Sequence, residues 1–93
     1  MRNLKLTPKA IEDLEKIDNP GLEKQVKKAL GLLQTNLRHP SLRTHKYESV
    51  KGPHGQDVFE AYAQNKTPGA YRIFWCYGPE KDQITILAIT AHP

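Results

Sequence analysis

The sequence predicts an α+β domain in which a short strand and two helices precede three antiparallel strands. Apolar residues recur at spacings of three and four through residues 11–37, and the spacing changes to the alternation of strands in residues 58–90. The length of 93 residues allows one compact core. We therefore expect a single domain, residues 1–93, with the two helices packed on one face of a small sheet.

The first half of the chain contains the strand and the helices. Asn3–Leu6 is the candidate strand, and Thr7-Pro8 then offers a helix cap followed by a proline suited to the first helical position. The same arrangement recurs in residues 18–21, where the first helix stops and the second begins. The apolar stripes of the two helices consist of Ile11, Leu14 and Ile17, and of Leu22, Val26, Leu30, Leu33 and Leu37. The short connection predicts an antiparallel hairpin that another layer must cover.

The second half is rich in β-branched and aromatic residues. Three strands are expected at Val58–Ala63, Ala70–Tyr77 and Ile84–Thr90. Short turns at residues 66–69 and 78–82 make these strands antiparallel neighbours in a meander. In the middle strand, alternation places Arg72 on the face opposite Tyr71, but both faces are substantially apolar, so the pattern does not decide which one receives the helices.

Residues 38–56 fit neither pattern. A structureless run of this length is unusual inside a compact domain unless it is functional. Residues 42–50 are compatible with a short extended piece, and residues 51–55 read as a turn.

Composition excludes several classes of protein. The single cysteine, Cys76, rules out an internal disulfide and a cysteine-rich zinc site, and its apolar neighbours indicate a buried, inert thiol. No apolar run approaches the roughly 20 residues of a membrane span, and residues 1–6 do not resemble a signal peptide, so we expect a cytoplasmic protein with no membrane partner. The histidines lack ligand spacing, and no phosphate loop is present, so we expect neither metal nor cofactor.

The positive charge lies mainly in the middle of the chain. The net charge is +4, and residues 37–72 hold six basic and three acidic residues, a balance of +3. Cations and aromatic rings together suit contacts with a nucleic-acid backbone and stacking on unpaired bases, although a solvated loop is the ordinary explanation. The candidate nucleic-acid-binding residues are Arg43, Lys46, Lys51, Tyr62 and Tyr71.

Two further residues are candidates for chemistry. Arg72 stands within an apolar strand and must either pair with an acid such as Glu60 or bind an external anion, for which guanidinium matches phosphate. Spacing alone favours the ion pair. His92 directly follows the last strand, and is either an ordinary terminal residue or an acid or base acting near neutral pH.

The second half of the chain resembles toxins of the RelE/ParE superfamily, which belong to bacterial toxin–antitoxin pairs. The resemblance rests on residues 70–75, which contain the pair Tyr71-Arg72, on the aliphatic strand 84–91 that ends in His92-Pro93, and on the strand-like stretch 58–62. The superfamily's order of strand, helical hairpin and meander covers essentially the whole chain. The resemblance also implies a cognate antitoxin as partner.

The resemblance implies one of two activities. RelE-like members cleave messenger RNA on the ribosome without a metal ion, through attack of the ribose 2′-hydroxyl on the adjoining phosphate, whereas ParE-like members block DNA gyrase. A non-catalytic nucleic-acid-binding domain is a third alternative. In the RelE-like case, Arg72 would stabilise the phosphate, His92 would match a C-terminal catalytic histidine, and Glu60 would be the base. This assignment requires an uncovered guanidinium at Arg72.

The chain departs from some ribosome-dependent members at Glu60 and Tyr62, where those members carry lysines. Lys46 and Lys51 are then the candidate cationic helpers. A mechanism that depends on lysines of the preceding strand is not expected for this chain.

Overall fold

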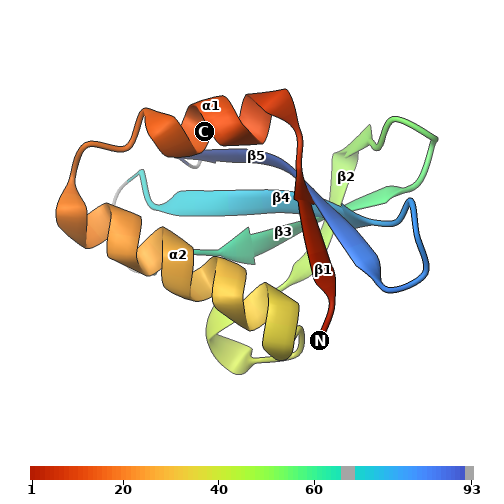
Figure 1. Cartoon of the computed structure of the whole chain (residues 1–93), viewed down its shortest axis with the longest axis horizontal. Coiled ribbons are helices and arrows are strands. Elements are labelled where there is room, and N and C mark those ends of the chain that lie inside the picture. Colours follow the sequence, from red (N-terminus) through yellow and green to blue (C-terminus); the bar gives the residue numbers. More distant parts are fainter. Residues whose placement is uncertain (66–68, 92–93) are drawn as a thin grey trace.

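The structure, a computed structural model, describes residues 1–65 and 69–91 and contains a five-stranded sheet with two helices (Figure 1). The elements in chain order are β1 (Asn3–Leu6), α1 (Pro8–Glu15), α2 (Pro20–Thr35), a 3-10 helix (Pro40–Leu42), β2 (His45–Lys51), β3 (Asp57–Tyr62), β4 (Tyr71–Tyr77) and β5 (Gln83–Ala91). The strand order is β1-β5-β4-β3-β2, with β1 parallel to β5 and the other neighbours antiparallel. The α+β class is confirmed.

The segment that fitted neither pattern supplies a 3-10 helix and strand β2. Residues His45–Lys51 form an edge strand that pairs with β3, so the antiparallel meander has four strands rather than the three expected. The extended piece that the sequence allowed within residues 42–50 thus overlaps β2, but its pairing with the sheet was not expected, because β2 is mostly exposed and shows no apolar alternation.

Both helices begin where the sequence predicts. The Thr7 hydroxyl accepts a hydrogen bond from the backbone N–H of Ala10, and the Asn19 side chain accepts one from that of Leu22. Each cap precedes a proline at the first helical position. The local sequence thus specifies both helix starts through the same capping chemistry.

The hydrophobic core lies between the helices and one face of the sheet (Figure 1). Ile73 and Trp75 of β4 pack into this core against residues of α2 such as Val26 and Leu33. The structure therefore settles which face of β4 receives the helices. Arg72 projects from the opposite face, which the helices leave uncovered.

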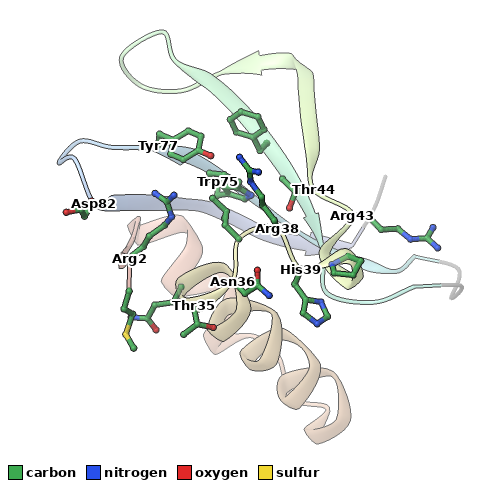
Figure 2. Close-up of a pocket in the computed structure, with 15 residues that line it drawn as sticks. Arg2, Thr35, Asn36, Arg38, His39, Arg43, Thr44, Trp75, Tyr77 and Asp82 are labelled. Carbon is green, nitrogen blue, oxygen red and sulfur yellow. The ribbon is translucent and has the colours of Figure 1, made fainter.

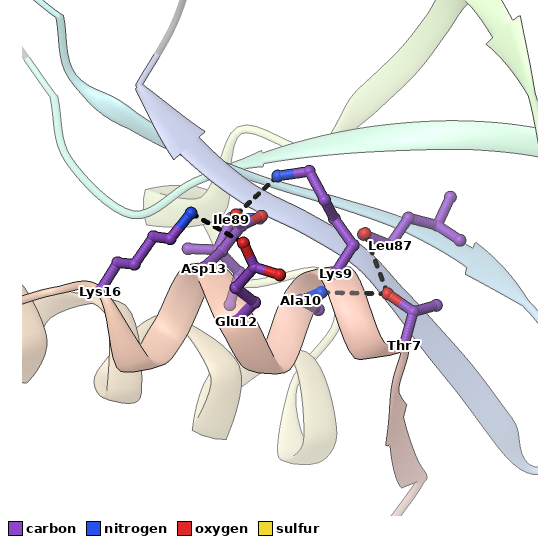
Figure 3. Close-up of polar contacts among 8 residues, drawn as sticks. All are labelled: Thr7, Lys9, Ala10, Glu12, Asp13, Lys16, Leu87 and Ile89. Atoms are coloured by element: carbon purple, nitrogen blue, oxygen red, sulfur yellow. Dashed lines mark hydrogen bonds and ion pairs between the residues drawn. The ribbon is translucent and has the colours of Figure 1, made fainter.

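Helix α1 completes one edge of the sheet. β1 pairs with β5 only as far as Ile86, and a bulge follows, since Phe74 pairs with Ala88 but Trp75 pairs with Ile86. Beyond that point α1 and its N-cap residue supply the hydrogen bonds: the Thr7 hydroxyl donates to the carbonyl of Leu87, and the buried Asp13 carboxylate accepts from the N–H of Ile89 at 3.0 Å (Figure 3). Side chains of α1 thus replace the strand partner that β5 lacks.

Cys76 is buried on the uncovered face, with 1% of its surface exposed. Burial raises the pKa of its thiol, an effect that a hydrogen bond with Gln56 partly opposes. Because alkylation needs an accessible thiolate, we expect native protein to resist iodoacetamide near neutral pH and denatured protein to be modified completely, as measured by intact mass. Rapid labelling of the native protein would contradict the packing described for this face.

Candidate functional site

A cluster of polar and aromatic side chains lies where β2, β3 and β4 meet on the uncovered sheet face. Its members, here called the open-face cluster, are Arg43, His45, Glu60, Tyr62 and Arg72. His45 pairs in register with Glu60, and Tyr62 with Arg72, so each pair projects to one side of the sheet. Glu60 and Tyr62 are two residues apart on β3, which places them about 7 Å apart on the same face.

Arg72 lies beneath Tyr62 and is 8% exposed. The centre of its guanidinium is 3.6 Å from the centroid of the Tyr62 ring, a cation–π contact. Its Nη1 donates to the carbonyls of Gln64 at 3.1 Å and Tyr71 at 3.3 Å. The expectation of an uncovered guanidinium is therefore wrong, because an aromatic ring from the neighbouring strand covers it.

The guanidinium of Arg72 nevertheless has no carboxylate partner among the described residues. The alternative expectation of an ion pair with Glu60 is also wrong, because Glu60 pairs with Phe74 in register and its carboxylate contacts a different side chain. The Nε atom of Arg72 is buried and donates no hydrogen bond within the described part of the chain. A buried cation with spare donor capacity is a candidate for binding an external anion.

Glu60 binds His45, which the sequence analysis did not single out as a functional residue. Glu60 is 3% exposed, and its Oε1 lies 2.8 Å from Nε2 of His45. The other ring nitrogen, Nδ1, lies 2.9 Å from the carbonyl oxygen of Arg43. Both ring nitrogens thus lie within hydrogen-bond distance of an oxygen atom, and a neutral imidazole that donates from Nε2 to Glu60 keeps the lone pair of Nδ1.

The His45 side chain is 48% exposed and lies between Glu60 and solvent. A substrate would therefore meet the imidazole before the carboxylate. Sequence reasoning missed this residue because its importance depends on the register between β2 and β3, which pattern alone does not provide.

Three of the predicted nucleic-acid-binding residues lie outside the cluster. Lys46 and Lys51 pair with Asp57 at 3.4 Å and 2.7 Å, and the hydrogen bond from Lys51 lowers the pKa of Asp57 while raising that of Lys51. Tyr71 packs against the hydrophobic core, on the sheet face opposite Arg72. Of the five predicted residues, the structure brings together only Arg43 and Tyr62; the candidate His92 lies outside the described residues.

A separate cavity of about 990 Å³ opens beside the carboxyl end of α2 (Figure 2). Phe59, Trp75 and Tyr77 line it from the strands, and their rings contact one another. Trp75 packs in the core, so this cavity lies on the helix-covered face, away from Arg72. Its remaining lining is largely polar and comes from the N-terminal segment, from residues between 34 and 44, and from Asp82 in the turn before β5.

Within residues 1–65 and 69–91, no three His, Cys, Asp or Glu side chains gather as a metal site would require. None of the helices in the described part of the chain is long and apolar enough to span a membrane.

Comparison with solved structures identifies the class of fold. The chain matches the toxin of the intact RelBE toxin–antitoxin complex of E. coli at 15% identity, covering 100% of this chain and 99% of that one, with a TM-score of 0.70. It matches archaeal RelE, from the RelE–RelB complex of Pyrococcus horikoshii, at 13% identity, 97% and 93% coverage and a TM-score of 0.69. A YoeB/ParE toxin from Agrobacterium tumefaciens matches at 9% identity, 98% and 99% coverage and a TM-score of 0.71.

These matches show that the chain has the RelE-type toxin fold over essentially its whole length. No protein-family model and no curated protein matches the sequence.

Proposed function

We propose that this chain is the toxin of a toxin–antitoxin pair and that it cleaves messenger RNA on the ribosome without a metal ion. The main support for the proposal is the arrangement of charged groups on the uncovered sheet face. Arg72 lies under Tyr62 and has no carboxylate partner among the described residues, and the Glu60 carboxylate contacts the His45 imidazole on the same face. The RelE-type fold supports the proposal independently.

The reaction needs three groups. A base takes the proton of the 2′-hydroxyl, whose oxygen bonds to phosphorus; the bond to the 5′-oxygen breaks, leaving a 2′,3′-cyclic phosphate; and an acid protonates the departing oxygen. In this chain the base is the neutral tautomer of His45 that donates from Nε2 to Glu60, and its unprotonated Nδ1 takes the first proton once the 2′-hydroxyl replaces the Arg43 carbonyl. Glu60 acts behind it as a positioning residue that stabilises the imidazolium.

Two arginines serve the phosphate. Arg43 is exposed, and the centre of its guanidinium lies 5.9 Å from the centroid of the Tyr62 ring. This is the same ring that covers Arg72. An incoming phosphate binds Arg43 first. Rotation of Tyr62 then exposes Arg72, whose paired N–H donors stabilise the negative charge that develops on the non-bridging phosphate oxygens. We assign the acid for the leaving oxygen to His92, which the resemblance to RelE-like toxins matches to a C-terminal catalytic histidine.

Expression of the chain without an antitoxin tests the proposal. We expect growth arrest together with cleavage of messages at ribosome-bound codons, mapped by primer extension. Arrest with intact messages and gyrase-dependent DNA breaks would instead indicate a ParE-like toxin. A harmless protein without affinity for RNA would indicate a non-catalytic domain, and either result would overturn the proposal.

The carboxylate–imidazole pair predicts a specific loss of rate. We expect Glu60→Gln and His45→Asn each to lower the cleavage rate about 100-fold or more, in the range that acid–base groups contribute. Glu48→Gln and His54→Asn are matched controls, since both residues are exposed and lie outside the open-face cluster. Equal activity of the His45 and His54 variants, measured in a reconstituted translation mixture, would exclude His45 from the reaction.

A further inference from the structure

The cavity beside α2 has the chemistry of a peptide-binding site. Three arginines line it, against a single acidic residue, Asp82. None of these arginines forms an ion pair with another described residue. The arginines are Arg2, Arg38 and Arg43. Unpaired cations gathered at one cavity favour an anionic occupant.

Arg2 and Arg38 are placed to hold that occupant. Figure 2 shows them extending toward the strands on either side of Trp75, whereas Arg43 points away from the centre of the cavity. The guanidinium of Arg2 lies 5.6 Å from the centroid of the Tyr77 ring. The rings of Phe59, Trp75 and Tyr77 together form what is here called the aromatic floor of the cavity. Each of the two guanidinium groups beside it can bind a carboxylate through two parallel hydrogen bonds, while an apolar side chain contacts the rings.

The aromatic floor favours a peptide over a nucleic acid. Trp75 is 1% exposed, so its ring face is covered, and the partly exposed Tyr77 already contacts Arg2 and its ring neighbours. Of the three rings, those of Phe59 and Tyr77 remain accessible, so the cavity offers contact for an apolar side chain but no row of open ring faces on which successive unpaired bases could stack.

We propose that this cavity binds an acidic segment of a partner protein, with its carboxylates on Arg2 and Arg38 and an apolar side chain against Phe59 and Tyr77. The inference rests on the proposed function in one point: a toxin's partner with such a segment would be its antitoxin. The site lies on the sheet face opposite Arg72, so the peptide would bind without occupying the open-face cluster.

Fluorescence anisotropy with three labelled probes of equal length tests the inference: a peptide of alternating glutamate and leucine, one of alternating lysine and leucine, and oligouridylate. We expect the acidic peptide to bind most tightly and Arg38→Glu to weaken it at least tenfold. Lys24→Glu, the same charge change at an exposed position of α2 outside the cavity, should change affinity less than twofold.

The outcomes separate this inference from the proposed function. An equal effect of Lys24→Glu would reduce the binding to nonspecific charge, and RNA binding that Arg38→Glu abolishes would make the cavity a nucleic-acid site. Either result, or absence of binding by the acidic peptide, would overturn the inference. Arg38→Glu should leave growth arrest unchanged, and Arg72→Ala should leave peptide binding unchanged, so the two can fail independently.

Discussion

Arg72→Ala should relieve growth arrest and lower the rate of messenger cleavage by about 100- to 1,000-fold, the loss that follows removal of one charge-stabilising donor from an active site. The reason is that Arg72 is the buried cation of the open-face cluster, and no described carboxylate neutralises its charge. Cleavage in a reconstituted translation mixture measures the loss directly, with growth of the expressing cells as the second readout.

Arg72 also supports the local structure, so the variant needs a control for folding. Its guanidinium stacks on Tyr62 and donates to two carbonyls, and alanine removes all three contacts. Arg72→Lys keeps the charge but loses the planar paired donors, and should show an intermediate rate. Full activity of a folded Arg72→Ala protein, with a native circular dichroism spectrum, would remove the basis of the nuclease proposal.

The second large effect concerns stability. Asp13→Ala should lower the free energy of unfolding by about 2 kcal/mol, because it leaves the backbone N–H of Ile89 buried without its acceptor. It also removes the partner of Lys9, whose Nζ lies 2.6 Å from the carboxylate. For a domain of this size the change corresponds to a fall in melting temperature of about 8 to 16 °C, measurable by thermal or urea unfolding.

Two variants separate the causes of this loss. Asp13→Asn retains an oxygen that can accept from Ile89 but loses the ion pair with Lys9, so we expect a smaller effect. Glu12→Ala removes an exposed carboxylate from the same helix turn, whose ion pair with Lys16 is at the surface, and should change stability little. If Asp13→Ala were no more destabilising than Glu12→Ala, the side chain of α1 would not hold the edge of β5.

Sequence patterns predicted the elements well where local chemistry decides them. Thr7 and Asn19 mark the helix starts because each cap needs only the next few residues. The sequence allowed an extended piece within residues 42–50 but did not predict that it pairs with the sheet as β2, because an exposed edge strand has no apolar periodicity. Two of the predicted site residues, Glu60 and Arg72, do lie on one sheet face. They neither form the expected ion pair nor leave Arg72 uncovered, because the Tyr62 ring lies over the arginine and the Glu60 carboxylate contacts His45.

The amino-acid sequence by itself determined both helix starts, the strands with a regular apolar pattern, the α+β class and the concentration of positive charge in the middle of the chain, because capping, periodicity and composition act over short stretches. Tertiary structure alone decided which face of β4 meets the helices, which side chain lies over Arg72, and which histidine meets Glu60. Those outcomes depend on pairing between strands distant in the sequence, where a shift of one residue moves every side chain to the opposite face.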